Sequence, residues 1–489
     1  MLSKVKTSLV AMGFVLAGSA LAAESKPNVL LIAIDDLNDW IGCMGGHPQA
    51  QTPNMDRLAA RGVLFTNAHC QSPVCNPSRL SMMSSLYPST TGVYFLNPDI
   101  SESPAAKDST MLPLRFQDEG YYVTGAGKIF HNGTQHNKYL PNWAGGFGGF
   151  GPYPKEKISP FPGMKLWDWG VFPESDDLMP DYKIAAWGAE QLAKDYEQPW
   201  LIATGYWTPH VPQYAPQKWF DLYPLETLQM PEMLENDLDD ISEYGVNLTR
   251  LNHVAPTMEW VEANDQLKLL VQSYLACISF TDHQIGKVLD ALDASPYKDN
   301  TYIVLYTDHG FHQGEKERFA KRSLWEDGTR TPMIIVGPGI VEGGVCSKPA
   351  QLLDIYPTLL ELTGLKADPK HEGNSLVPLL KNPQAEWPHY ARTSFGPGNY
   401  AIISEDYRYI HYNDGSEEFY DRRKDAHDWN NVIDNPEYAA VIKKHRAEVP
   451  QERHEILGER STGHKSFQAT EAISRGEPVP DFNQRKKKK

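Results

Sequence analysis

The feature of this sequence that most constrains the fold is an uninterrupted, largely apolar run near its start. The run Asn28–Ile34 (NVLLIAI) stops at two consecutive aspartates, Asp35 and Asp36. Such runs are typical of strands that are buried on both faces of a parallel sheet. We therefore expect a central strand here, with both carboxylates at its carboxyl end.

Other segments repeat this strand pattern and alternate with helical patterns. Residues 52–62 begin Thr-Pro and end at Gly62, which predicts a capped helix with proline at its first position. Gln266–Leu292 spaces its apolar residues by three, four and seven, which predicts a long amphipathic helix. The further predicted strands are Trp200–Tyr206, Tyr302–Tyr306 and Pro332–Val336. This alternation indicates a doubly wound α/β sheet.

Two long loops and a change of texture complete the outline. Residues 139–181, rich in Pro and Gly, and residues 211–263 are expected to be long loops that shape a binding site. After Leu380, short alternating segments predict a small antiparallel sheet, followed by a helix near Glu437–Glu448. These segments are Ala401–Ser404, Tyr407–Tyr412 and Glu418–Asp421. The tail from Gln468, which ends in five basic residues, is predicted to be disordered.

The start of the chain has the layout of a secretory signal peptide. Lys4 and Lys6 precede an apolar run from Leu9 to Leu21 and a small-residue site at Ala22. An N-terminal membrane anchor is the alternative, although the run is short and interrupted by glycine and serine. We expect a secreted or periplasmic protein without a membrane span after cleavage. The predicted organisation is a signal peptide over 1–22, an α/β domain over 23–384 and a smaller domain over 385–489.

The overall charge limits the partners. The chain has 46 Lys and Arg against 62 Asp and Glu, a formal net charge of −16, so a broad basic surface for nucleic acid is not expected. An anionic substrate would instead have to meet a local cluster of cations. The five cysteines are too few for a disulfide framework, and their odd number leaves at least one unpaired.

The most informative short motif is Cys75-Asn76-Pro77-Ser78-Arg79. A cysteine one turn ahead of a helix that starts at proline lies at the positive end of the helix dipole, here beside an arginine. Cys75 is thus a candidate nucleophile. A buried structural cysteine is the alternative for the motif taken alone.

Three carboxylates and an imidazole are expected at one edge of the sheet. Asp35 and Asp36 end one predicted strand, and Asp308 and His309 end another. Converging carboxylates repel one another unless a cation neutralises them, which argues for a metal. Oxygen ligands favour Ca²⁺ or Mg²⁺, while the imidazole leaves Zn²⁺ open. Helix capping or a turn is the alternative role for each aspartate pair.

Several cationic side chains lie beyond a short apolar segment or a predicted strand. Lys128 and His131 belong to a GKIFH segment, His210 ends a WTPH segment, and Lys321 lies beyond Asp308. Taken singly, each is more ordinarily a surface residue or a hydrogen-bonded histidine. Together they supply the charge needed to hold a small tetrahedral dianion.

At this point the sequence resembles the type I sulfatases, which depend on formylglycine, and within them the iduronate-2-sulfatase-like group. The motifs that carry the resemblance are ordered along nearly the whole mature chain. They are Asn28 to Asp36 (N-V-L-L-I-x-x-D-D), Cys75 to Arg79 (C-x-P-S-R), Gly127 to His131 (G-K-x-F-H), Tyr206 to His210 (aromatic-x-x-P-H), Asp308 to Lys321 (D-H-G…G-E…A-K) and Gly373 to Leu380.

The resemblance implies a fold, a cofactor and a reaction. The fold would be an alkaline-phosphatase-like doubly wound mixed sheet between helices, with a smaller C-terminal α+β domain. A formylglycine-generating enzyme would convert Cys75 to formylglycine. One hydroxyl of the hydrated aldehyde would attack sulfur, and the other would then eliminate sulfate. The substrate would be a sulfate monoester, expected on a carbohydrate.

Roles for individual residues are carried over from the family in the same way. One Ca²⁺ would be held by Asp35, Asp36, Asp308, His309 and the formylglycine at position 75. Arg79 and Lys128 would stabilise the hydrated aldehyde, and His131 would bond to its hydroxyl. His210 and Lys321 would bind sulfate and protonate the leaving oxygen, with His210 the first choice as general acid.

The sequence departs from the family pattern in places, and other functions stay open. Ser84-Ser85-Leu86 stands where Thr-Gly-Arg is usual, which could weaken recognition by the maturation enzyme. Residues 425–428 replace the usual Asp-Pro-x-Glu, with no evident catalytic consequence. The alternatives are a phosphatase or phosphonate monoester hydrolase of the same superfamily, and a non-catalytic protein that binds sulfated glycans. Aromatic residues that could stack on a sugar or pack in the core are Trp167, Trp169, Tyr206, Trp207 and Phe311.

Overall fold

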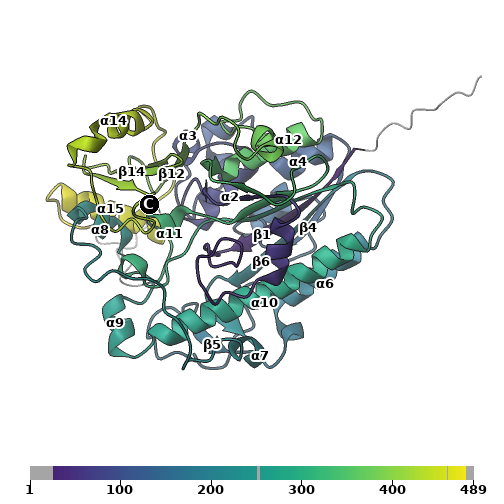
Figure 1. Ribbon diagram of the computed structural model, residues 1–489, viewed down its shortest axis with the longest axis horizontal. Coiled ribbons are helices and arrows are strands. Elements are labelled where there is room, and N and C mark those ends of the chain that lie inside the picture. Colours follow the sequence, from purple (N-terminus) through teal and green to yellow (C-terminus); the bar gives the residue numbers. More distant parts are fainter. Residues whose placement is uncertain (1–25, 251–253, 460, 481–489) are drawn as a thin grey trace, which may run out of the picture.

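The computed structural model describes residues 26–250, 254–459 and 461–480 and is organised around one seven-stranded sheet (Figure 1). The predicted signal peptide, 1–22, and the last residues of the predicted tail, 481–489, lie outside the described residues. The strand order is β10 (Gly344–Cys346), β2 (Val63–Phe65), β9 (Met333–Val336), β8 (Thr301–Thr307), β1 (Asn28–Asp35), β6 (Trp200–Pro209) and β4 (Tyr122–Gly127).

The predicted first strand is the centre of this sheet. Strand β1 is buried along its whole length and pairs in parallel with β6 on one side and β8 on the other. Strand β4 extends the parallel part beyond β6, whereas β9 runs antiparallel to both β8 and β2. The sheet is therefore mixed, which confirms the predicted fold class.

Helices cover both faces of the sheet and separate the core into two layers (Figure 1). Alternate residues of β1 point to opposite faces, as they do in any strand. Leu30, Ile32 and Ile34 pack on the side of α1 (Pro53–Ala59), α6 (Pro180–Leu192) and α10 (Leu267–Asp293). Val29, Leu31 and Ala33 pack on the side of α2 (Cys75–Ser84), α4 (Leu112–Asp118) and α12 (Ile355–Leu362). Burial on both faces explains why the β1 sequence is continuously apolar.

The predicted helices form, but one of the predicted caps does not. Helix α10 matches the predicted amphipathic helix, and α1 begins at Pro53 as predicted. The Thr52 hydroxyl does not cap α1; it accepts a hydrogen bond from the Gly42 amide at 2.7 Å.

One of the two predicted loops is confirmed, and the other is not. Residues 139–181 are mostly irregular, with one short strand, β5 (Trp169–Val171), which pairs with β7 (Gln213–Ala215). Residues 211–263 are not one loop. They include helices of four to seven residues, which are too short for hydrophobic periodicity to reveal them. These are α7 (Gln217–Phe220), α8 (Glu243–Thr249) and α9 (Met258–Ala263).

The C-terminal part contains the predicted antiparallel sheet, seen at the left of Figure 1. It has four strands, one more than predicted, and α14 (Ala439–Ala447) packs on one face. Its strands are β12 (Ala391–Ser394), β13 (Tyr400–Ile403), β14 (Tyr407–His411) and β15 (Glu417–Asp421). The other face packs on aromatic residues that precede this sheet in the chain, among them Tyr94 and Trp325.

The prediction of a disordered tail from Gln468 is wrong for its first part. Helix α15 runs over Thr462–Ser474, and Phe467, Thr470 and Ala472 are buried. Tyr244 and Asn413 donate hydrogen bonds to the Glu471 carboxylate. The segment is polar, but these contacts to a preformed surface hold it in place.

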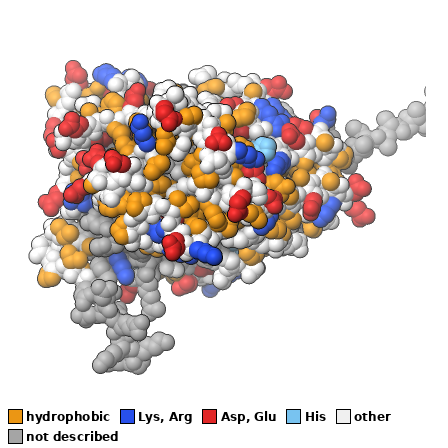
Figure 2. Space-filling model, turned by 90° about the horizontal axis from the view of Figure 1, so that it is seen from below, with side chains coloured by type: hydrophobic (Ala, Val, Ile, Leu, Met, Phe, Trp, Pro, Cys, Tyr) orange, Lys and Arg blue, Asp and Glu red, His pale blue; other side chains and the backbone are white. Residues whose placement is uncertain are grey.

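The surface mixes charges of both signs. On the face shown in Figure 2, acidic and basic side chains are interspersed with apolar ones outside the grey atoms. Within the described residues, every helix falls short of the length or apolar character that crossing a membrane requires.

Candidate active site

The carboxyl ends of β1, β4, β6 and β8 meet with the start of α2 at one edge of the large sheet. Hydrogen bonds, ion pairs or close approaches connect all of the predicted site residues there. The residues brought together are Asp35, Asp36, Cys75, Arg79, Lys128, His131, His210, Asp308, His309 and Lys321. This convergence follows from topology, since parallel strands place their carboxyl ends side by side.

Three buried carboxylates form the base of the site. Oxygens of Asp35, Asp36 and Asp308 lie within 4.8 Å of one another, and all three side chains are inaccessible to solvent. Successive strand residues point to opposite faces, but Asp36 has a φ of 61° and so leaves the strand conformation. The pairing of β1 with β6 also shifts register at this point. Both aspartates can therefore face the other side chains of the group named above, which we call the pocket.

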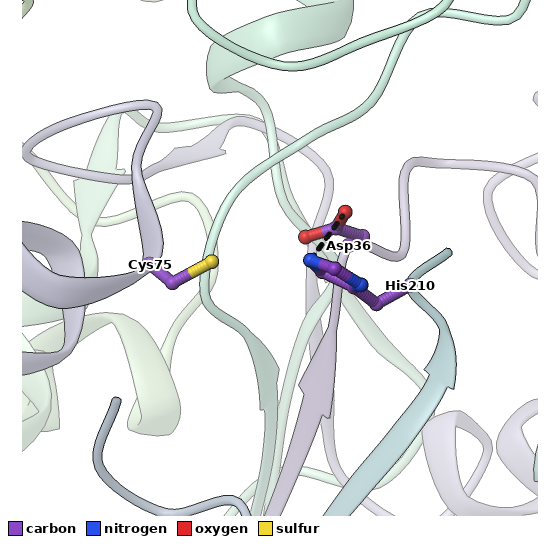
Figure 3. A group of neighbouring side chains, drawn as sticks. All are labelled: Asp36, Cys75 and His210. Atoms are coloured by element: carbon purple, nitrogen blue, oxygen red, sulfur yellow. Dashed lines mark ion pairs between the residues drawn. The ribbon is translucent and has the colours of Figure 1, made fainter. Parts of the chain in front are cut away.

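Cys75 lies across from Asp36 and His210, with its sulfur directed toward them (Figure 3). Cys75 is the first residue of α2, and Pro77 follows within the first turn. The helix therefore begins about one turn earlier than predicted, at Cys75 itself. Its Sγ lies 3.3 Å from Lys321 Nζ and 3.4 Å from His309 Nε2.

The charges around Cys75 change the acidity of its thiol. Burial alone would raise the pKa, but the nearby Lys128, Lys321 and His309 charges outweigh burial and hold the pKa well below its usual range. A hydrogen bond with His131 acts in the same direction. The pocket thus favours negative charge at position 75.

Arg79 and Lys128 neutralise the inner carboxylates. The Arg79 guanidinium lies one turn along α2 from Cys75 and is 1% exposed. It donates from Nε to Asp308 Oδ2 at 2.8 Å and from Nη2 to Asp35 Oδ1 at 3.0 Å. Lys128 Nζ pairs with the other oxygen of Asp35.

The segment after β4 is shaped by an internal histidine. His136 Nε2 accepts hydrogen bonds from the amides of Ile129 and Phe130, both at 3.0 Å. The Asn132 side chain caps α5 (Gly133–Tyr139) by accepting from the Gln135 amide at 3.0 Å. These contacts fix the backbone between Lys128 and His131. His131 Nδ1 is buried and has no partner among the described residues.

His210 and Lys321 face Asp36 from two further elements. His210 Nε2 lies 3.7 Å from Asp36 Oδ2, the pair drawn in Figure 3. Lys321 Nζ donates to the two oxygens of Asp36 at 2.5 and 2.8 Å. The Asp181 carboxylate accepts from the amides of Trp207 and Thr208, both at 2.9 Å, and so holds the end of β6 that carries His210.

The donor set suits a divalent cation. Burial raises the pKa of Asp36 to about 7, even though the Lys321 ammonium opposes this shift. An additional positive charge would therefore stabilise the carboxylate form. Three carboxylates are the ligands of a hard ion, and the His309 imidazole, 3.4 Å from Asp36 Oδ1, is available beside them.

Sequence reasoning missed three contributors to the site. Asp181 and His136 are buried positioning residues whose partners are backbone amides, and no motif marks such residues. Arg322 follows Lys321 with a φ of 73°, is 6% exposed, and has an Nη1 without a partner among the described residues. A second basic residue next to Lys321 was a visible signal for Arg322.

The predicted sugar-stacking aromatics are mostly core residues. Four of them are buried in the layer beneath the site, and only Trp207 is half-buried. Phe150 packs edge-on against Trp207, and Lys128 Nζ lies 4.9 Å from the centre of the Phe150 ring. All five cysteines are free thiols.

Comparison with known families gives consistent matches. Residues 27–365 match the family model described as Sulfatase, and residues 314–455 match the model described as N-sulphoglucosamine sulphohydrolase, C-terminal. A protein named Sulfatase from Formosa agariphila is 44% identical over 441 residues and is covered to 87%, as is this chain. Iduronate 2-sulfatase from Mus musculus is 30% identical over 401 residues, with 71% of both chains covered.

Solved structures share the fold. The phosphonate monoester hydrolase of Agrobacterium radiobacter superposes with a TM-score of 0.69 at 20% identity, covering 86% of this chain and 94% of that chain. At this identity the similarity concerns the fold alone.

Proposed function

Because the chain belongs to the sulfatase family and is a sulfuric ester hydrolase, we propose that it removes sulfate from a sulfated carbohydrate. The single observation that carries the mechanism is the position of the buried Cys75 thiol. It lies within hydrogen-bonding distance of Lys321 and His309 and beside three carboxylates. We also propose that the protein is exported, that 23–384 and 385–489 are its two domains, and that a formylglycine-generating enzyme matures Cys75.

Formylglycine at position 75 would supply a hydrated aldehyde as the nucleophile in place of a thiol. The surroundings of Cys75 suit that group. Its hydroxyls would lie where Sγ lies now, next to Lys321 and His309, and the pocket already favours negative charge at this position. His131, whose Nδ1 lacks a partner among the described residues, would bond to a hydroxyl there.

Ca²⁺ would be held by Asp35, Asp36, Asp308, His309 and the residue at 75, and would supply positive charge to the sulfuryl oxygens. Three carboxylates already face three cations, Arg79, Lys128 and Lys321. A divalent ion added to this balanced set leaves a net positive pocket, which is complementary to sulfate.

The remaining chemistry belongs to cationic side chains. Lys128 and Lys321 face the centre of the pocket, where charge collects on the sulfuryl group in the transition state. His210 is the first choice as the acid that protonates the leaving oxygen. Its Nδ1 lies against the Val211 carbonyl, so its Nε2 is the nitrogen that faces Asp36 and the pocket.

Arg322 bears on the class of sugar. A buried guanidinium without an anionic partner is costly, so we propose that Arg322 binds an anionic group of the substrate. Burial lowers the pKa of Arg322, and the opposing effect of the Cys75 and Asp36 charges supports a position close to these residues. A carboxylate on the sulfated sugar fits this position, and iduronate 2-sulfatase is named for such a sugar acid.

A phosphonate monoester hydrolase is the second candidate, because a structure of that name shows that this fold can also support that reaction. Rates on matched aryl sulfate, aryl phosphate and aryl phosphonate esters separate the two. We expect the sulfate ester to react fastest. A phosphonate preference would overturn the proposal.

The proposed nucleophile and metal are tested together on the purified, co-matured protein. Mass spectrometry of the peptide that contains residue 75 should show the aldehyde, and elemental analysis should show one calcium per chain. Asp308→Asn should lose calcium, whereas Asp290→Asn, an exposed carboxylate on α10, should keep it. Normal sulfate release from material that lacks the aldehyde would refute the mechanism.

The general acid is tested with aryl sulfates whose leaving groups differ in pKa. A variant that lacks the acid should lose most rate on the poorest leaving groups. We expect this steeper dependence for His210→Gln. A steeper dependence in Lys321→Ala alone would move the role to Lys321.

A further inference from the structure

A second group of metal-ligating side chains lies outside the pocket described above. His312, Glu315 and Asp327 each place one ligand atom within 4.8 Å of those of the other two. His312 and Glu315 belong to the segment between His309 and Lys321, and Asp327 belongs to α11 (Glu326–Thr329). None of these three residues has a role in the proposed reaction.

The imidazole of His312 has one nitrogen without a hydrogen-bond partner. The ring is fully buried, and its Nε2 lies 2.6 Å from Ser323 Oγ. Its Nδ1 has no partner within hydrogen-bonding distance in the described residues and lies 3.9 Å from Asp327 Oδ2. A buried polar nitrogen that faces carboxylates across a gap this long is not satisfied by them directly.

The carboxylates of this group also lack counter-charges. Among the described residues, neither Glu315 nor Asp327 forms an ion pair with a lysine or an arginine. Burial raises the pKa of Glu315 to about 7, with a contribution from Asp39. Burial likewise raises the pKa of Asp327 well above its usual range, with contributions from Glu315 and Asp39. A bound cation would stabilise the ionised form of both carboxylates.

The histidine cannot supply the missing charge. Burial lowers the pKa of His312 well below its usual range, and the Arg318 and Lys316 charges lower it further against a smaller effect of the Glu315 carbonyl. A neutral imidazole that donates from Nε2 to Ser323 presents a lone pair at Nδ1. That lone pair and two carboxylates then face one another, an arrangement that a bound cation would stabilise.

We propose that His312, Glu315 and Asp327 form a second metal site, which takes a divalent ion of intermediate hardness such as Zn²⁺ or Mn²⁺. One imidazole with two carboxylates suits such ions better than it suits Ca²⁺, which prefers oxygen ligands throughout. The Ser323 hydroxyl is the outer partner of the metal-binding histidine, as is usual for such ligands.

The site would join the two ends of the segment that presents Lys321. The His312 amide donates to the Ala320 carbonyl at 3.1 Å, and the Gly310 amide donates to the Gly328 carbonyl at 3.2 Å. A side chain at Gly310 would lie 2.0 Å from the Asp327 carbonyl oxygen, so these backbones approach closely. A metal ion between His312 and Asp327 would tie this segment to α11 directly behind the pocket.

The test measures metal binding and needs no turnover. The full chain carrying Cys75→Ala is depleted of metal, saturated with calcium and titrated with Zn²⁺ and then Mn²⁺ by calorimetry, with elemental analysis after dialysis. We expect one additional ion per chain. We also expect Asp327→Asn to weaken its binding by at least about tenfold.

Two further variants identify where the ion binds. Asp308→Asn disables the carboxylate cluster of the pocket and should keep the additional ion, and Asp290→Asn controls for exposed carboxylates. The zinc X-ray absorption spectrum of the chain that carries only Cys75→Ala should show an imidazole ligand. This ligand should disappear when His312→Gln is added. The proposal is overturned if no additional ion binds, or if Asp308→Asn rather than Asp327→Asn removes it. If Asp308→Asn or Asp327→Asn fails to fold, the spectrum of the chain that carries only Cys75→Ala decides. Absence of an imidazole ligand from that spectrum overturns the proposal.

Discussion

Two buried clusters of charged side chains in this molecule contain the same types of residue but have different roles. One is the pocket at the carboxyl edge of the large sheet. The other lies where the C-terminal sheet meets α11, and its charged residues are Glu326, Arg408, Arg422 and Asp428. The second cluster contains two cationic and two anionic side chains, whereas the pocket contains three carboxylates and, with Arg322, four cations.

The clusters differ in whether every cation has an anionic partner. Arg408 pairs with both Asp428 and Glu326, and Arg422 pairs with Glu326, although Arg408 Nε and Asp428 Oδ1 lack a well-directed hydrogen bond within the described part of the chain. In the pocket, by contrast, Arg322 forms no ion pair among the described residues, and its Nη1 has no hydrogen-bond partner there. A cluster in which every cation is paired holds elements together, whereas an unpaired cation is prepared for a ligand. The experiments below test this difference.

Cys75→Ala should have the largest effect. Sulfate release should fall by about 10⁴-fold or more, because the nucleophile is lost, while the thermal midpoint stays close to that of the parent. The matched control is Cys346→Ala, another buried cysteine, which should keep its rate. Full activity of Cys75→Ala would make the pocket a structural cluster like the other one.

Arg408→Met should act on stability rather than on chemistry. It leaves Asp428 buried without its counter-charge and Glu326 with Arg422 as its main partner, so the free energy of unfolding should fall by about 3–5 kcal/mol. Urea denaturation measures this. Arg446→Met, which breaks the half-exposed pair with Glu417, should cost less than about 1 kcal/mol. A loss of turnover per folded molecule in Arg408→Met would contradict the comparison.

Lys321→Ala should act on chemistry rather than on stability. With calcium present, turnover should fall on the order of 10²-fold or more, because a cation facing the sulfuryl group is removed. Steady-state rates on an aryl sulfate measure this. A rate within about twofold of the parent would exclude Lys321 from the pocket's chemistry.

Low pH should reduce the contribution of His136 to the free energy of unfolding. Burial lowers the pKa of His136 to about 4, from 6.5, so its stabilising effect is present above pH 6.5 and is lost as the pH falls toward 4. The free energy of unfolding should drop by up to about 1.4 kcal/mol per pH unit in that window. His136→Gln, which can still accept the two amides, should show a shallower slope. Equal slopes would remove His136 from the explanation.

The sequence predicted β1, β6 and β8, because each is a buried, largely apolar run that ends close to residues of the proposed chemistry, such as Asp35 and Asp308. It indicated β4, which precedes Lys128 and His131, only as a short apolar segment. It did not predict β12, the short helices of 211–263 or α15, whose stability comes from contacts that are distant in sequence.

The same limit applies to charge. Asp428 belongs to a segment with no expected catalytic consequence, yet it is fully buried against Arg408. Nothing in the local sequence shows that this aspartate meets a strand residue twenty positions earlier. Chemical motifs were predictable because their residues follow strands, whereas the ion pairs that join the two sheets depend on tertiary packing.

The left-handed backbone at Asp36 limits what can replace this residue. A β-branched residue would bear a conformational penalty besides losing the carboxylate, whereas Asn, like Asp, tolerates this conformation better than most residues. Asp36→Asn therefore separates the role of charge from that of geometry, and Asp36→Gly also accommodates the geometry but removes the side chain altogether. Laboratory selection for new substrates should accordingly leave position 36 restricted to these few small residues, even where the chemistry of the neighbouring loops drifts.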